Sequence, residues 1–432
     1  MRILSADWVV PVEGAPIRDG AVAIEGSRIV AVGASSELGE GERHPDAVIL
    51  PGFVNAHSHL EYAVYGGFGD GLSFAPWILI HMERKARIGI EEMEAIARAG
   101  ALECLRSGIT TVGDCSFSGA AAAACAQLGL RAIVYLEVFG RDAAPLEERF
   151  LELRERVEPH LSGRVRLGVS PHAPYTCAPE LYAACLELDG LPAATHLNES
   201  SDELEWIVRG TGPWESFAVE LPPPLGETGI RALARRDLLS PRMLAAHCVK
   251  VDEEEIGLLA AHDVPVAHCP RSNAALGCGV APLAELRAAG LRVGLGTDSP
   301  ASAPSFDMFD EMRVALYAAR AREERPDALS TTDVLELATI GSARALGLED
   351  EIGTLAPGKQ ADLTVLSLAD SPFLPWEDPV TAAVLGGAPE RVVATLVAGE
   401  TRYEKGGETW PELTAAAHSA RSRLLSHAVV TS

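Results

Sequence analysis

Short apolar runs alternate with helical stretches through the middle of the chain. Eight runs have the length and composition of buried β-strands, and they cover residues 48–56, 109–114, 131–138, 165–170, 192–196, 243–247, 264–268 and 291–297. Between them, apolar residues recur at helical spacing, for example in residues 91–106, 145–158, 253–261 and 282–289. Strands that alternate with helices in this way form parallel sheets. Eight β-α units predict an α/β fold built around a closed (β/α)8 barrel.

Both ends of the chain have a different pattern, in which apolar and polar residues alternate over short segments. Residues 1–10, 20–26 and 27–33 predict antiparallel strands, and a second set of short strands is predicted between residues 352 and 403. Neither set has enough strands to bury one face alone. We therefore expect the two ends to form one small sheet domain together.

The composition is that of a globular protein rather than a disordered one. Hydrophobic residues make up 47% of the 432 residues, and no apolar run approaches the roughly 20 residues that span a bilayer. The first residues do not have the pattern of a signal peptide, so we expect a cytoplasmic protein without a membrane partner. The formal net charge of −25 argues against binding to nucleic acid. The eight scattered cysteines are expected to be small buried residues rather than disulfides.

Histidines follow the predicted strands at the ends where barrel enzymes keep their active sites. His57 and His59 come at the end of the first run, and residues two apart on a strand point to the same side. Four more of the twelve histidines end later runs, namely His172, His196, His247 and His268. Packing alone does not explain half of the histidines at one rim. The pattern therefore predicts a metal site.

Our proposed metal ligands are His57, His59, His196 and Asp298. Three imidazoles and one carboxylate suit a divalent transition metal with an open position for water. We expect one Zn²⁺ ion, with Fe²⁺ or Mn²⁺ as alternatives that the same ligands accept. Such an ion lowers the pKa of its bound water from about 15.7 towards ~7. No lysine follows the fourth run, so we do not expect a two-metal centre bridged by a modified lysine.

Three acidic or basic residues are candidates for proton transfer. Glu199 comes three residues after His196 and can reach over the metal as a general acid and base. His247 would lie across from it and hydrogen-bond the water or polarise the substrate. Asp298 can bind the metal or accept a proton from the same water, and the sequence leaves both roles open.

These residues resemble those of the amidohydrolase superfamily, in its mononuclear, cytosine-deaminase-like branch. The resemblance extends over nearly the whole chain and is carried by residues 51–59, 196–199, 246–249, 296–299 and 352–363. It implies a distorted (β/α)8 barrel, a composite β-sandwich from both termini, zinc or iron, and hydrolytic deamination. It also implies that His57, His59, His196 and Asp298 hold the metal, that Glu199 transfers the proton and that His247 contacts the attacking water.

The predicted domains follow from this pattern. They are residues 1–50 and 348–410 for the two parts of the β-sandwich, 51–347 for the barrel and 411–432 for a C-terminal helix. Apolar residues at helical spacing predict that helix. It either packs on the outside of the barrel or forms an oligomer contact. We expect a homodimer, because symmetric dimers are the commonest oligomers.

Residues 269–279 resemble the aminodeoxyfutalosine deaminases within this branch. Relatives that deaminate methylthioadenosine or adenosylhomocysteine more often carry a different residue where this chain has Arg271. The Arg271 guanidinium could bind the benzoate of aminodeoxyfutalosine, or it could only brace its loop. Ser272, Asn273 and His172 are further predicted substrate contacts.

Residues 74–84 resemble the family's substrate-covering loop. Trp77 and Glu83 are the substrate contacts predicted there, with Glu83 binding ribose hydroxyls. The spacing between these two residues is shorter than in the methylthioadenosine deaminases.

The sequence thus predicts a metal-dependent deaminase of a small adenine-containing nucleoside. The first candidate substrate is 6-aminodeoxyfutalosine, which would place the enzyme in menaquinone biosynthesis. Methylthioadenosine, S-adenosylhomocysteine and adenosine are alternatives, and so is a triazine substrate for a chlorohydrolase or aminohydrolase. A non-catalytic scaffold on the same fold would have lost ligands, whereas this chain has the complete set.

Overall fold

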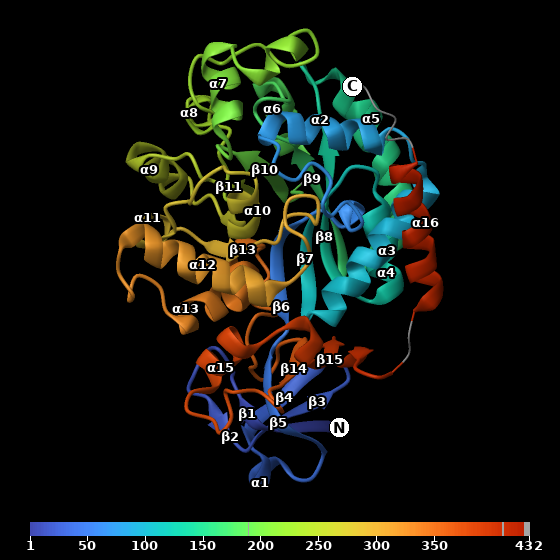
Figure 1. Cartoon of the computed structure of the whole chain (residues 1–432), viewed down its shortest axis with the longest axis vertical. Helices are drawn as coiled ribbons and strands as arrows, with labels where there is room; N and C mark the ends of the chain where they lie inside the picture. Colours follow the sequence, from blue (N-terminus) through green and yellow to red (C-terminus); the bar gives the residue numbers. More distant parts are fainter. Residues whose placement is uncertain (189, 408–409, 427–432) are drawn as a thin grey trace.

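The computed structural model describes residues 1–188, 190–407 and 410–426. Its larger part is a barrel of parallel strands in sequential order (Figure 1). These strands are β6 (Phe53–Ser58), β7 (Ile109–Ser116), β8 (Arg131–Val138), β9 (Val165–Pro171), β10 (Ala193–Leu197), β11 (Met243–His247), β12 (Val266–His268) and β13 (Val293–Leu295). A bridge between Ser58 and Asp298 brings the chain after β13 back to β6. The predicted (β/α)8 barrel is confirmed.

Helices surround the barrel and cover its mouth. Those of the first half are α2 (Phe74–Lys85), α3 (Ile90–Arg106), α4 (Ala120–Leu128), α5 (Ala144–Val157), α6 (Pro179–Glu187), α7 (Ser201–Arg209) and α8 (Gly229–Ala234). Those of the second half are α9 (Glu253–Ala261), α10 (Pro270–Ala275), α11 (Leu283–Ala288), α12 (Met308–Glu323), α13 (Thr331–Glu336) and α14 (Ser342–Ala345). In α3, the residues Met93, Ile96, Ala97 and Ala101 are buried, and their spacing forms the single apolar face that a surface helix packs inward.

The second sheet is built from both ends of the chain, in the order β16-β15-β14-β5-β1-β3-β4 with β2 beside β1. Its strands are β1 (Arg2–Val9), β2 (Ile17–Arg18), β3 (Gly20–Glu25), β4 (Arg28–Ala34), β5 (Glu42–Pro51), β14 (Leu363–Ser367), β15 (Val392–Val397) and β16 (Glu400–Glu404). Strand β5 joins the two ends, because it pairs parallel with β1 and antiparallel with β14. Helices α1 (Ser35–Leu38) and α15 (Pro379–Gly386) accompany this sheet. The predicted composite sheet domain is confirmed.

The first predicted strand, residues 48–56, is in fact two strands. Strand β5 ends at Pro51 in the small sheet, and β6 begins at Phe53 in the barrel. A Cβ at Gly52 would lie 2.2 Å from Thr110, so only glycine fits where the chain passes from one sheet to the other. The apolar run is continuous because both strands are buried, and hydrophobicity alone does not reveal a change of sheet.

The C-terminal helix α16 (Pro411–Leu425) packs on the outside of the barrel against α3 (Figure 1). Ala417, Ala420 and Leu424 form its buried face. The last part of the predicted helix, residues 427–432, lies outside the described residues. All eight cysteines are buried and free, as predicted. Among the described helices, none is long and apolar enough to cross a membrane.

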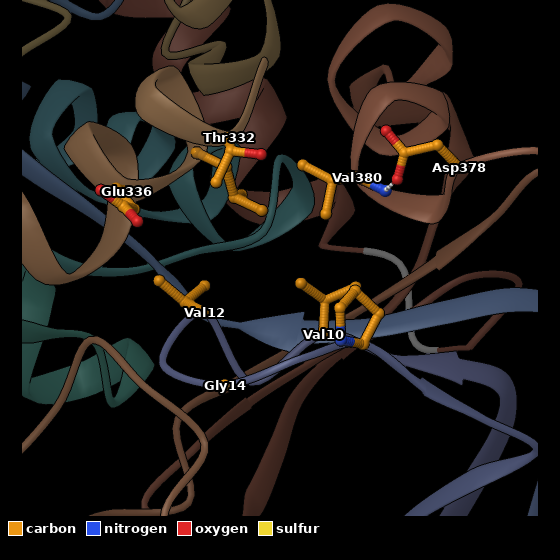
Figure 2. Close-up of a pocket in the computed structure, with 9 residues that line it drawn as sticks. Val10, Val12, Gly14, Thr332, Glu336, Asp378 and Val380 are labelled. Carbon is orange, nitrogen blue, oxygen red and sulfur yellow. Dashed lines mark hydrogen bonds between the residues drawn. The ribbon is translucent and has the colours of Figure 1, made fainter. Parts of the chain in front are cut away.

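Figure 2 shows a pocket of about 190 Å³ at the junction between the small sheet and helices α13 and α15. Val10, Val12 and Val380 contribute much of its apolar lining. None of the predicted site residues lines it, so this pocket is separate from the barrel mouth.

Candidate active site

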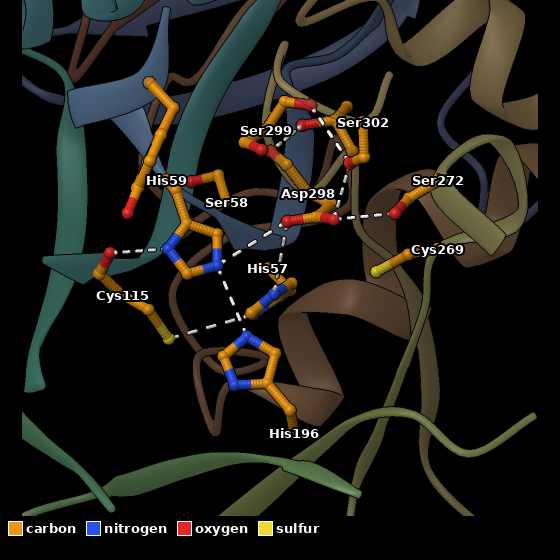
Figure 3. Close-up of polar contacts among 12 residues, drawn as sticks. His57, Ser58, His59, Cys115, His196, Cys269, Ser272, Asp298, Ser299 and Ser302 are labelled. Carbon is orange, nitrogen blue, oxygen red and sulfur yellow. Dashed lines mark hydrogen bonds and ion pairs between the residues drawn. The ribbon is translucent and has the colours of Figure 1, made fainter. Parts of the chain in front are cut away.

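Four side chains from three barrel strands converge at one end of the barrel (Figure 3). His57 comes from β6 and His59 directly follows it, His196 comes from β10, and Asp298 from the turn after β13. The Nε2 atoms of His59 and His196 lie 3.3 Å apart. The Oδ1 atom of Asp298 lies 3.5 Å from His59 Nε2 and 3.8 Å from His57 Nε2. The structure therefore brings all four predicted metal ligands together.

The backbone turn that carries Asp298 is held in place by Asn55. The Asn55 side chain donates to Thr297 Oγ1 (2.7 Å) and accepts from the Thr297 backbone N–H (2.9 Å). Asp298 itself has a φ of 55°, in the left-handed region that few non-glycine residues adopt. Its Oδ2 atom accepts hydrogen bonds from Ser272 Oγ (2.7 Å) and Ser302 Oγ (2.8 Å). These contacts leave Oδ1 directed at the histidines.

The ring orientations suit metal binding. His59 Nδ1 donates to the Cys115 carbonyl (2.9 Å), and His196 Nδ1 donates to the His172 carbonyl (2.7 Å). Because a carbonyl oxygen only accepts, each Nδ1 carries the hydrogen and each Nε2 keeps a lone pair for a metal. His57 Nε2 is buried and has no hydrogen-bond partner. Ligand atoms about 2.0–2.1 Å from a tetrahedral zinc are roughly 3.3–3.4 Å apart, close to the distances observed here.

The charges at this site also favour a cation. Burial, together with the neighbouring histidines, lowers the pKa of His57 well below its ordinary value, which keeps the imidazole neutral and able to bind a metal. Burial acts to raise the pKa of Asp298, but His59, His247, Ser272 and Ser302 outweigh it and lower this pKa overall. Three neutral imidazoles and one carboxylate are thus the charge state expected here. The residues present fit a divalent transition metal.

Glu199 and His247 lie beside the candidate metal ligands. Glu199 Oε1 is 3.6 Å from His247 Nδ1, and both residues are buried. Burial raises the pKa of Glu199 well above its ordinary value, and the nearby carboxylates Asp298 and Glu203 raise it further. A raised pKa brings a carboxyl group closer to the pH range in which it can both give and take a proton, as general acid-base catalysis requires.

Three of the predicted substrate contacts lie at the site. Ser272 binds Asp298, and Asn273 Oδ1 accepts a hydrogen bond from His247 Nδ1 (2.9 Å). His172 follows β9, remains partly exposed, and has its ring 4.7 Å from the His196 ring. Ser272 and Asn273 thus contact proposed site residues directly, whereas His172 presents a partly exposed ring.

The other three predicted contacts are placed differently. Trp77 is buried, and its Nε1 donates to the Ala301 carbonyl (3.2 Å). Glu83 lies on the outer face of α2 with its side chain 64% exposed and is paired with Arg87. The Arg271 guanidinium is bound by Glu311 and by Ser305. The structure therefore does not bring Glu83 to the site, and for Arg271 it favours the alternative of bracing the loop.

Two site residues were missed by the sequence analysis. Cys115 supports two candidate ligands, through its carbonyl to His59 and with its Sγ 3.8 Å from His57 Nδ1. Glu137 is the penultimate residue of β8, and its Oε1 lies 4.0 Å from His59 Nδ1. The same strand-end argument, applied to carboxylates, would have found Glu137.

Comparison with known proteins assigns a family to this arrangement. The family model described as "Amidohydrolase family" matches residues 48–402. The chain is 33% identical over 404 residues to the 5'-deoxyadenosine deaminase of Methanothermobacter thermautotrophicus, covering 90% of each chain. It is 34% identical over 421 residues to the 5-methylthioadenosine/S-adenosylhomocysteine deaminase of Symbiobacterium thermophilum, covering 93% of each chain. Among solved structures, an adenosine deaminase from Xanthomonas campestris with bound zinc is similar, with a TM-score of 0.87, 28% identity and 98% of each chain covered.

Proposed function

The chain belongs to the amidohydrolase family, and from this premise we propose that it is a metal-dependent hydrolase that removes the 6-amino group of an adenine nucleoside. The observation that carries the proposal is the convergence of His57, His59, His196 and Asp298 next to a buried Glu199. The names of the relatives support it, since the two curated relatives described above act on adenine nucleosides.

Each proposed catalytic residue has one task in this reaction. A divalent metal held by the four ligands would supply an activated water for attack on C6 of the adenine ring. Glu199 transfers the two protons of the attacking water in turn, the first to the ring nitrogen next to C6 and the second to the departing amino group, and so returns to its starting state. His247 Nδ1 carries the ring hydrogen and donates it to Asn273 Oδ1, so the Nε2 atom can accept a hydrogen bond from the water. The products are ammonia and the corresponding 6-oxo nucleoside.

We infer that the substrate is an adenosine derivative altered at its 5' position. The relatives named for 5'-deoxyadenosine, methylthioadenosine and adenosylhomocysteine support this class. The sequence-based preference for 6-aminodeoxyfutalosine, and with it the link to menaquinone biosynthesis, depended on a free Arg271. Because Glu311 and Ser305 occupy that guanidinium, 6-aminodeoxyfutalosine is one candidate within the class rather than the first.

An ammonia-release screen with metal analysis of the same sample tests the proposal. The panel is 5'-deoxyadenosine, methylthioadenosine, adenosylhomocysteine, adenosine, 6-aminodeoxyfutalosine, guanine, cytosine and a chlorinated triazine. We expect one metal ion per chain and turnover of at least one adenosine derivative at a kcat/KM far above that of guanine or cytosine. Chloride release from the triazine without deamination of any nucleoside would overturn the proposal.

A further inference from the structure

Glu137 is a buried acidic residue that receives no hydrogen bond from the residues that the structure describes. Its exposed fraction is only 2%, and it lies at the carboxyl end of β8, where the barrel mouth opens. His59 Nδ1 lies 4.0 Å from Glu137 Oε1, but this N–H already donates to the Cys115 carbonyl. Within residues 1–188, 190–407 and 410–426, no hydrogen bond reaches the Glu137 carboxylate. Buried carboxylates are costly unless they are paired, so this group needs a partner that a bound molecule can provide.

Lys85 is a second charged side chain close to the candidate metal ligands. Its Nζ donates to the Tyr62 hydroxyl (2.8 Å) and lies 3.6 Å from the centre of the Phe117 ring. The Tyr62 ring in turn lies 5.9 Å from the His59 ring, which places this lysine near the candidate metal ligands. An ammonium group has three N–H donors. One of them is used by Tyr62.

The two charges act on each other without touching. Burial raises the pKa of Glu137 and lowers the pKa of Lys85, and for each group the charge of the other is the largest influence that opposes the shift. No ion pair or hydrogen bond joins the two groups in the part of the chain that the structure describes. The Lys85 ammonium and the Glu137 carboxyl group are therefore too far apart to hydrogen-bond each other directly.

A series of aromatic side chains extends from Lys85 towards the candidate metal ligands. Phe117 follows β7, Phe139 follows β8 and His172 follows β9, and all three are partly exposed. The Phe117 and Phe139 rings are 6.1 Å apart, and the Phe139 and His172 rings are 4.8 Å apart. These rings form a wall that leads from Lys85 to His196, where the chemistry is proposed to occur.

We propose that Glu137 and Lys85 form the subsite for the sugar of the nucleoside, an inference that rests on the proposed function. A sugar hydroxyl donates to the Glu137 carboxylate, and a hydroxyl oxygen accepts from the Lys85 ammonium. A vicinal diol offers donors and acceptors a short distance apart, so it suits a carboxyl group and an ammonium that do not bond each other directly. The residue expected to bind ribose from the sequence, Glu83, points to the outer face of α2, whereas Lys85, at the end of the same helix, lies near the site.

A second metal ion is the competing occupant of this space. Donor atoms of Glu137, His172 and His196 lie close enough together to hold a cation. Two hydrogen bonds argue against it, because His196 Nδ1 carries a hydrogen and His172 Nδ1 is bonded to Thr176 Oγ1 (2.8 Å). The positive charge of Lys85 would also repel a cation. The contacts favour an uncharged, hydroxyl-bearing ligand.

Steady-state kinetics of Glu137→Gln and Lys85→Met on paired substrates test the subsite. The substrates are adenosine and 2',3'-dideoxyadenosine, which differ only in the sugar hydroxyls. Glu152→Gln and Lys405→Met, which alter exposed side chains away from the mouth, are the matched controls. We expect each site variant to lose about 10-fold to 100-fold in kcat/KM with adenosine. The loss with the dideoxy compound should be at most a few-fold, and metal content should remain at one ion per chain.

The outcomes separate the two proposals. Equal losses on both substrates in both site variants would overturn the sugar subsite while leaving the deaminase intact. A metal content of two ions per chain that falls to one in Glu137→Gln would overturn it in favour of a second metal site. If Glu137→Gln fails to fold, the same comparison with Lys85→Met decides. A metal-loaded wild-type protein that deaminates no adenine nucleoside overturns the proposed function, and the subsite with it.

Discussion

The side chain of Glu203 holds the backbone of the proposed catalytic residue Glu199. Its Oε2 atom accepts a hydrogen bond from the Glu199 backbone N–H at 2.7 Å. The same carboxylate accepts the backbone N–H groups of Asn198 (3.1 Å) and Ser200 (3.4 Å). Ser200 Oγ in turn accepts from the Glu203 backbone N–H, which completes a capping box at the start of α7. The position of the proposed proton carrier thus depends on a carboxylate four residues further along the chain.

Glu203→Gln should therefore lower kcat more than it changes KM. A glutamine has one acceptor oxygen, and its NH₂ group would face backbone donors. We expect kcat to fall about 10-fold to 100-fold, as small displacements of catalytic groups do, with unchanged metal content. Glu205→Gln, on the exposed face of the same helix, is the control. Equal kcat values for the two variants would contradict this role.

Glu199→Gln should bind metal normally yet lose nearly all turnover. The amide preserves shape but cannot carry a proton, and general acid-base catalysis contributes roughly 10²-fold to 10⁴-fold. Ammonia release and metal analysis on one sample check both parts. The departing amino group needs a proton, so a variant that keeps full ammonia release would contradict the role assigned to Glu199.

Removal of the metal should destabilise the protein. A ligand that binds only the folded state stabilises it by about 2.7 kcal/mol at a concentration 100 times its Kd. We expect a chelator to lower the Tm of the wild type and added zinc to restore it. His57→Ala should lose most of this response, whereas His160→Ala, outside the site, should retain it. A Tm that chelation leaves unchanged would contradict the proposed ligand set.

The sequence predicted the ligand set because the ends of apolar runs mark the ends of strands. Parallel strands bring these ends to one rim, so His57, His196 and Asp298 could be grouped before their distances were known. Side-chain partners from distant segments could not be predicted in this way. Arg271 pairs with Glu311, 40 residues away on α12. The direction of Glu83 depends on how α2 is rotated against the barrel, which the spacing from Trp77 does not determine.

Unfolding of the wild type should depend on pH through Glu103. Burial raises the pKa of Glu103 from an ordinary value of 4.5 to about 7, although a hydrogen bond from the Phe306 backbone N–H (3.2 Å) and the charge of Arg271 oppose the rise. Between these two pH values the folded state keeps a proton that the unfolded state has lost, so stability falls as pH rises.

Glu103→Gln removes this titration. The free energy of unfolding of the variant, relative to wild type, should therefore increase by about 1 to 3 kcal/mol between pH 4.5 and 7.5. Denaturant unfolding at several pH values measures it. Glu91→Gln, at the exposed start of the same helix, is the control. A difference between Glu103→Gln and wild type that does not change with pH would contradict the assignment.

Arg421 on α16 connects the C-terminal helix to the segment that leads from the metal ligands to α2. Its guanidinium donates to the carbonyls of Val64 and Gly66 and lies 4.6 Å from the centre of the Phe68 ring. Helix α2 follows this segment and ends at Lys85. Loss of the Arg421 guanidinium should therefore make the chain segment between His59 and Lys85 less well ordered, without a direct change at either residue.

Arg421→Ala should destabilise the protein by about 1 to 2 kcal/mol, because two backbone carbonyls lose a charged donor. If Lys85 contacts the substrate, the same variant should raise KM several-fold, because α2 is held less firmly, while kcat and metal content change little. Arg423→Ala, which removes the same charge from the same helix and breaks a contact with Glu92, separates this effect from a general effect of charge. Equal KM values for the two variants would mean that α16 stabilises the barrel without positioning α2. A higher KM in Arg421→Ala alone would make the C-terminal helix part of the structure that shapes the substrate site.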